Sequence, residues 1–256
     1  MNIEELKKAD KQLENEISQL AKDNSLSNED IEPITDGVSD IEAYYNSNPR
    51  IMWVLKEPYD DFDEDGNPKS DGWSITKDVF NNKYGYAWTC QSWKPIIYSM
   101  YGFLNRISFF DPKMPWVEND NSIQSVLKQI AYINVNKMPS TTISPKEWCN
   151  TYKIWKGIIS KQIKLYNPNV IILCGVNDVI DDSLCENCSC GKSSSCNCQK
   201  MHIESQPKYM HIYKTEDGRL LIYTYHPGYP KLKNEDNLGE YVNSIISAIN
   251  LYKHAQ

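Results

Sequence analysis

Residues 51–60 of the chain read IMWVLKEPYD, and this stretch is the strongest indication of the fold class. Five consecutive apolar residues, followed at once by charged and turn-forming ones, are typical of a strand buried on both faces of a parallel sheet. The runs AYINV at 131–135 and VIILCG at 170–175 have the same character. Residues 92–107 carry apolar residues at helical spacing, and the SPKE sequence that opens 144–166 is a helix-start signature. Strands that alternate with helices predict a three-layer α/β/α domain around a central, mainly parallel sheet.

The other segments divide the chain into two parts. The sequence predicts an amphipathic helix at 3–22 and a short helix at 40–45. It also predicts a hairpin with a glycine turn at 211–225 and a final helix at 238–253. We therefore expect an N-terminal helical extension, residues 1–48, and an α/β domain, residues 49–256. That domain carries a cysteine-rich insert at 183–202.

The composition excludes several classes of protein. The 256 residues are 40% hydrophobic and 24% charged, so disorder and collagen-like repeats are excluded. The formal charge of −7 means that bulk attraction to a polyanion cannot drive binding to nucleic acid, although a local basic groove is allowed. No stretch approaches the roughly 18 apolar residues that cross a bilayer, and the N-terminus opens charged rather than with an apolar signal core. We expect a cytoplasmic protein with no membrane partner.

Polar residues follow three of the predicted strands at the point where each strand ends. Ligands of an open parallel sheet bind beyond the carboxyl ends of its strands, so these residues are candidates for one shared cleft. In chain order they are Lys56, Glu57, Tyr59, Asp60, Asn134, Asn136, Lys137, Tyr225, His226 and Pro227. Lys137, together with Lys231 and Lys233, is also a candidate for contacts with phosphate groups.

Four segments resemble, in order, motifs of the uracil-DNA glycosylase superfamily. LKEPYD at 55–60 is similar to the first motif, written GQDPYH in one branch and GEAPG in another. YINVNKMP at 132–139 and TYHPGY at 224–229 resemble the YITNVVKCRPP and TYHPSY segments of the iron-sulfur branch. YNPNVIILCG at 166–175 looks like the LRPRVIVALG strand of that branch. The resemblance covers roughly residues 50–250 and implies the α/β fold of that superfamily.

The resemblance implies a DNA glycosylase-like hydrolase without a cofactor for its chemistry. Such an enzyme takes a flipped-out, uracil-type or modified base from single- or double-stranded DNA and cleaves its N-glycosidic bond with an activated water. Donors must face the leaving base, and a carboxylate must lie near the positively charged sugar. By motif position, Asn134 reads the base edge and His226 donates a hydrogen bond to the departing base. Glu57 stands where the GQDPYH branch has its water-orienting aspartate.

The remaining expected site residues contact substrate. Tyr59 matches the family tyrosine that excludes bulky bases. Trp73, which follows a turn-rich acidic loop, is the expected aromatic face on which a base stacks. Lys56 and Tyr225 complete the substrate-binding set.

Departures from the family pattern keep other interpretations open. Leu55 and Lys56 replace the glycine and the glutamine or glutamate of the first motif, and Gly228 replaces a serine or alanine of the last. Only Cys149 has a counterpart among the four cluster cysteines of the iron-sulfur branch, so no such cluster is expected. Asn134 could instead cap the turn that follows it. The alternative function is therefore a catalytically inactive nucleic-acid or nucleotide-binding protein of the same fold, and a protein-interaction module ranks third.

Residues 183–202 contain the densest cluster of metal-ligand residues in the chain. Five cysteines lie within fourteen residues, with the spacing Cys-x2-Cys-x-Cys-x5-Cys-x-Cys from Cys185, and His202 follows. Four thiolates from a short loop can surround a tetrahedral Zn²⁺. The sequence favours a structural zinc, with Cys185, Cys188, Cys196 and Cys198 as the provisional ligands. The alternative is a loop of reduced thiols.

Overall fold

The main sheet places four parallel strands side by side. The computed structural model describes residues 2–60, 63–67, 69–81, 83, 85–140, 145–176, 201–202, 210–215 and 217–254. In this part of the chain the sheet has seven strands, in the order β2 (Gly37–Val38), β5 (Ile130–Asn134), β3 (Ile51–Leu55), β6 (Val170–Cys174), β9 (Leu220–Thr224), β8 (Met210–Lys214) and β7 (Met201–His202). Strands β5, β3, β6 and β9 are parallel, whereas β2 and β8 pair antiparallel with their neighbours. The three apolar runs and the hairpin are confirmed as strands.

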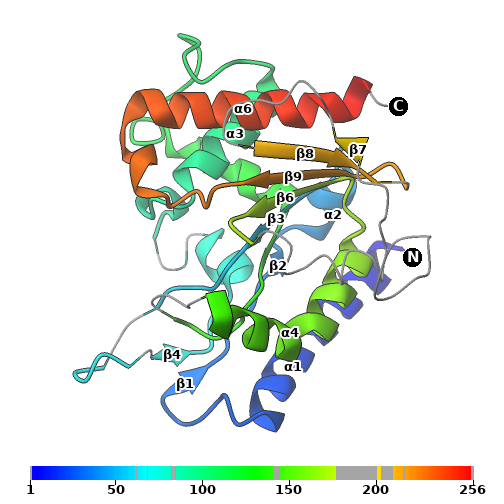
Figure 1. Cartoon of the computed structure of the whole chain (residues 1–256), viewed down its shortest axis with the longest axis vertical. Coiled ribbons are helices and arrows are strands. Elements are labelled where there is room, and N and C mark those ends of the chain that lie inside the picture. The colour runs from blue at the N-terminus through cyan, green and yellow to red at the C-terminus, as the bar shows by residue number, and fades with distance from the viewer. Residues whose placement is uncertain are drawn as a thin grey trace.

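Helices cover both faces of this sheet (Figure 1). One face carries α1 (Ile3–Asp23), α2 (Ile41–Tyr45) and α4 (Pro145–Tyr166), and the other carries α3 (Lys94–Asn105), the 3₁₀ helix η3 (Asn121–Gln129) and α6 (Glu235–His254). Alternate residues of β3 enter the two cores: Trp53 packs on the α3–α6 side and Val54 on the α1–α4 side. The α/β class is confirmed, with a mixed sheet whose centre is parallel.

Shorter elements connect these layers. They are the two-stranded parallel pair β1 (Ile31–Glu32) and β4 (Ser70–Asp71), the π-helix η1 (Ile75–Val79), and the 3₁₀ helices η2 (Ala87–Thr89) and η5 (Pro230–Lys233). Helix α3 begins two residues later than the periodicity predicts, at Lys94, so residues 90–93 form a turn. That difference matters because the turn lies over the candidate site described below.

Residues 2–48 pack closely against the parallel strands. Strand β2 pairs with β5 through Gly37 opposite Tyr132. Helix α1 begins with a capping box between Asn2 and Glu5, and its apolar stripe is buried against the sheet and α4. The Tyr166 hydroxyl of α4 donates to Asp10 of α1 at 2.6 Å. Gly37 has φ +138°, and any side chain there would overlap that hydroxyl, so glycine is required.

Within the described ranges, every helix is too short or too polar to serve as a membrane span.

The buried carboxyl of Asp10 predicts how stability depends on pH. Burial raises the pKa of Asp10 to about 6, with the Tyr166 hydrogen bond opposing the shift. The folded chain thus holds this proton more tightly than the unfolded chain, whose aspartate titrates near about 3.9. This contribution to the free energy of unfolding is therefore present below about pH 4 and is lost as the pH rises through about 6.

Asp10→Asn keeps an acceptor for Tyr166 and removes the buried charge. We expect it to raise the free energy of unfolding by about 2 kcal/mol at pH 7 and to change it little at pH 4. Urea unfolding at the two pH values measures both effects. An equal effect at both would contradict the assignment of the raised pKa to Asp10.

Candidate functional site

The carboxyl ends of the four parallel strands lie along one edge of the sheet, and the chain segments that leave β3 and β5 stay together beyond it. The carbonyl oxygens of Leu55 and Lys56 accept hydrogen bonds from Val135 and Asn136 at 2.9 and 2.8 Å. Further on, the Pro58 carbonyl accepts from Ser140 at 3.1 Å. The two segments expected to carry site residues are therefore held side by side.

Asn134 ends β5 with its side chain fully inside the protein. It lies opposite Leu55 in the sheet and, by strand alternation, on the same face as Tyr132. Its side chain is 0% exposed, yet neither the amide oxygen nor the amide nitrogen has a hydrogen-bond partner among the described residues. An unsatisfied buried amide costs about 1–3 kcal/mol. Such a side chain is suited to a ligand that offers both a donor and an acceptor.

A buried ion pair supports Asn134 from behind. Asp36, just before β2, accepts from the Asn134 backbone N–H at 2.6 Å and from Lys137 Nζ at 2.8 Å through each carboxylate oxygen. Gln162 of α4 donates to Asp36 at 2.8 Å and accepts from Lys137 at 3.0 Å. The side chains of Asp36 and Lys137 are both 0% exposed. The expectation that Lys137 contacts phosphate is therefore wrong, because its ammonium group is enclosed by these partners.

Asn136 also supports the loop rather than facing the cleft. Its side-chain oxygen accepts from the Met138 backbone at 3.0 Å and from the Trp155 indole at 3.1 Å. A separate asparagine therefore stabilises the turn after β5, and the Asn134 side chain takes no part in that described hydrogen bonding.

His226 lies just beyond β9 and is neutral. Its Nδ1 accepts a hydrogen bond from the Gly228 N–H at 3.1 Å, which leaves the ring proton on Nε2 as a donor. Burial lowers the pKa of His226 to about 4, and the positive charge of Lys56 adds to this effect. Gly175, at the end of β6, lies between them: a Cβ there would be 3.4 Å from Lys56 Cε and 3.8 Å from His226 Cβ.

Asn134 and His226 lie at the carboxyl ends of two strands of the same sheet. Their strands, β5 and β9, are separated by β3 and β6, three interstrand steps or about 14 Å. Lys56 and Gly175 leave the two intervening strands. An amide and a neutral imidazole donor thus stand at opposite ends of a row of four strand termini.

The turn at 90–93 bridges these two ends, although the periodicity of residues 92–107 predicts that its second half is helical. Ser92 Oγ lies 2.6 Å from the position that a Cβ on Gly228 would occupy. The Trp93 ring packs edge-on against Tyr132, with centroids 6.3 Å apart. The turn therefore reaches from β5 to the His226 loop. Ser92 and Trp93 are site-forming residues that only the tertiary structure reveals.

The other expected site residues lie at different depths. Glu57 is half-buried directly after Lys56, beside the β5 loop. Tyr59 is 69% exposed and Tyr225 is 50% exposed, with the Tyr225 ring stacked on Tyr229 at 5.2 Å. The structure thus places Lys56, Glu57, Asn134 and His226 along the sheet edge, and both tyrosines at the surface.

Trp73 lines a neighbouring acidic cleft. Its indole N–H donates to Asp60 at 2.7 Å. The cleft has a volume of about 600 Å³, and Glu29, Asp30 and Asp71 also line it. Four carboxylates around Trp73, with Lys69 as the one cation among the lining residues, make this side of the edge unsuited to phosphate groups.

The zinc prediction concerns a segment that lies outside the described residues. Its provisional ligands are Cys185, Cys188, Cys196 and Cys198. Elsewhere in the chain, over the described ranges, no group of three or more His, Cys, Asp or Glu side chains is arranged to hold a metal ion.

Neither a scan against models of known protein families nor a search of curated proteins found a match to this chain.

Breaking the buried ion pair should destabilise the fold. Lys137→Met leaves the Asp36 carboxylate buried without its cation, so we expect the free energy of unfolding to fall by about 3–5 kcal/mol. Adding Asp36→Asn should restore part of this loss, because the buried charge is then gone. Lys161→Met is the control: Lys161 pairs with Glu16 at 2.7 Å on the surface and should cost less than about 1 kcal/mol. Urea unfolding measures all three, and a loss below 1 kcal/mol for Lys137→Met contradicts the role of the pair.

The protonation of His226 can be measured directly. We expect its imidazole to titrate near pH 4 in ¹H–¹⁵N NMR spectra of the folded chain. Lys56→Met should raise this midpoint because a nearby positive charge is removed, whereas Lys8→Met on α1 should leave it unchanged. A wild-type midpoint near the ordinary value of about 6.5 would contradict the buried, neutral state.

Proposed function

We propose that this protein is a DNA glycosylase-like hydrolase that cleaves the N-glycosidic bond of a flipped-out base. The observation that carries the proposal is the fully buried side-chain amide of Asn134, which has no hydrogen-bond partner among the described residues, at the same sheet edge as the neutral imidazole of His226. A nucleobase edge presents the adjacent donor and acceptor that such an amide needs. The opposite end of the base then faces a hydrogen-bond donor.

The proposed reaction uses the two groups for different tasks. Asn134 binds the base edge and holds it in one orientation. The glycosidic bond breaks, its electron pair moves to the base nitrogen, and the sugar gains positive charge. The Nε2–H of His226 donates a hydrogen bond to the developing negative charge on the base. The imidazole is neutral and keeps its proton while it stabilises this charge. Water attacks the sugar carbon, and the proton that it loses passes through solvent to the anionic base nitrogen, so the products are a neutral free base and an abasic site.

Lys56 and Glu57 occupy suitable places for the charges that develop. The Lys56 ammonium contributes positive potential at His226, on the side where the base becomes negative. Glu57 follows it in sequence, and a carboxylate there can orient the water and stabilise the cationic sugar. Tyr59, Trp73 and Tyr225 remain proposed substrate contacts, with Trp73 facing a base rather than a phosphate because its cleft is acidic.

The family resemblance supports the same function. The four resembling segments, 55–60, 132–139, 166–175 and 224–229, fall on β3, β5, β6 and β9 and the residues after them. These are the four adjacent parallel strands, so motifs that are distant in sequence meet at one edge.

A second candidate is a nucleic-acid or nucleotide-binding protein of the same fold that lacks catalysis. Two residues favour it. Lys56 replaces the family glutamine or glutamate, and Glu57 is one methylene longer than the water-orienting aspartate.

A base-release assay separates the two candidates. Oligonucleotides carrying uracil, hypoxanthine or modified bases are incubated with the protein, and abasic sites are then cleaved with alkali. We expect one class of base to be released, and Asn134→Ala, His226→Ala and Glu57→Gln each to slow release by about a hundredfold or more.

His211→Ala changes an exposed histidine on β8 and is the matched control, expected to leave release unchanged. Release of no base by the folded wild type, with binding that still depends on Asn134, would overturn hydrolysis in favour of the binding protein. Release that is unaffected by Asn134→Ala would contradict the proposed site.

A further inference from the structure

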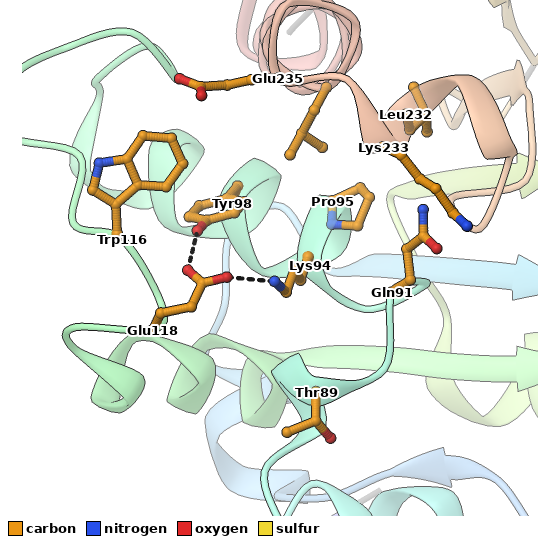
Figure 2. Close-up of a pocket in the computed structure, with 11 residues that line it drawn as sticks. Thr89, Gln91, Lys94, Pro95, Tyr98, Trp116, Glu118, Leu232, Lys233 and Glu235 are labelled. Atoms are coloured by element: carbon orange, nitrogen blue, oxygen red, sulfur yellow. Dashed lines mark hydrogen bonds and ion pairs between the residues drawn. The ribbon is translucent and has the colours of Figure 1, made fainter.

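A second pocket lies on the outer side of the 90–93 turn. It has a volume of about 420 Å³ and is formed between the start of α3, the start of α6 and the loop at 116–118 (Figure 2). Trp116 forms one wall, Lys233 and Gln91 lie opposite it, and Tyr98 and Pro95 lie between them. This size is within the range of pockets that hold small organic ligands, about 300–1,000 Å³.

The pocket adjoins the candidate site through two shared segments. Residues 89–95 contribute Ser92 to the His226 loop and Gln91 to the pocket wall. Residues 226–233 carry His226 at one end and the pocket residue Lys233 at the other. The pocket and the His226 loop are thus built from the same two segments of the chain.

The lining suits a nucleobase joined to a phosphate. Trp116 is 44% exposed and is held edge-on against Tyr98, with centroids 6.2 Å apart. The side-chain nitrogen of Gln91 is buried and has no hydrogen-bond partner among the described residues, so it can donate to a base carbonyl or ring nitrogen. Lys233 is exposed at the rim, whereas Lys94 is already paired with Glu118. Of the two lysines that line the pocket, Lys233 is thus the one in no described ion pair, and the Glu235 carboxylate lies on the α6 side of the same pocket.

Two pairs of stacked aromatic rings lie on the chain segments that contribute to the pocket, close in sequence to Thr89 and Leu232. Tyr86 stacks on Trp88 with centroids 6.3 Å apart, and Lys94 lies 5.6 Å from the Trp88 ring. Tyr225 stacks on Tyr229 beside His226. Proteins bind single strands by stacking unpaired bases on such rings, whereas duplex binding depends on many phosphate contacts.

We infer that the substrate is single-stranded nucleic acid, and that the base next to the target is bound in this pocket, against Trp116. The inference rests on the proposed function for the identity of the site, but it is tested without any chemistry. A base in the pocket must be unpaired, so a duplex cannot occupy it without opening. The competing occupant is an aromatic side chain of a protein partner, which the test below distinguishes.

The test is fluorescence anisotropy with a labelled dT12 strand and with the same strand annealed to dA12, neither of which carries a target base. We expect wild type to bind dT12 at least tenfold more tightly than the duplex. Trp116→Ala should weaken dT12 binding about tenfold, the loss expected for one stacked base. Lys233→Met, an exposed change, should weaken it severalfold and reduce its salt dependence.

Two controls and thermal melts accompany these variants. Phe110→Ala removes another exposed aromatic residue, one that does not line this pocket, and Lys8→Met removes a lysine on α1; both variants should bind dT12 within twofold of wild type. If Trp116→Ala lowers the melting temperature, dT12 binding is judged from Lys233→Met and Trp116→Phe instead. Trp116→Phe keeps an aromatic face for the base.

The inference is overturned if the strand and the duplex bind equally, or if no pocket variant alters dT12 binding. It is also overturned if the protein binds no nucleic acid and Trp116→Ala changes its self-association, measured by light scattering. The last outcome assigns the pocket to a protein. If no pocket variant alters dT12 binding but base release persists and still depends on His226, the proposed function stands and only the pocket assignment fails. Release that is absent while Trp116-dependent dT12 binding is present rejects the hydrolase and keeps the pocket.

Discussion

The buried contact between Asp36 and Lys137 is the interaction on which the arrangement of the site depends. It joins three parts of the chain that are remote in sequence: the segment before β2, the turn after β5, and, through Gln162, helix α4. Replacing a buried ion pair by apolar residues is often neutral or stabilising, so stability alone does not account for it. Its distinctive effect is positional, because the same carboxylate binds the backbone N–H of Asn134. The pair therefore fixes where the Asn134 amide stands.

A second constraint is the separation of functions along the sheet edge. The side-chain amide of Asn134 has no partner within the described part of the chain, whereas Asn136, two residues later, stabilises the turn. His226 is held neutral by burial and by Lys56, and its Nδ1 is occupied by the Gly228 N–H. The two groups differ in chemistry and are about 14 Å apart at the backbone, the spacing of three strands. That geometry favours one planar ligand held at both ends over direct contact between the two side chains.

The sequence predicts the framework well because short apolar runs report burial on both faces of a parallel sheet. Residues 51–55 and 170–174 are strands as predicted, and their termini lead to Lys56 and Gly175 at one edge. Residues whose roles depend on distant partners are not predictable in this way. Lys137 resembles a surface phosphate ligand until Asp36, about a hundred positions away, is seen beside it. Ser92 and Trp93 resemble the first turn of a helix, and only the tertiary structure brings them over the site.

The proposed site requires Asn134 and His226 to hold the same base. It is tested most directly by NMR titration with a single-stranded oligonucleotide that contains 2′-fluoro-2′-deoxyuridine, in which the fluorine strengthens the glycosidic bond and keeps the base attached. The Asn134 side-chain NH₂ and the His226 ring resonances are followed together. We expect the resonances of both groups to shift, with one shared dissociation constant. Saturable binding of the oligonucleotide that leaves either group unmoved would contradict it.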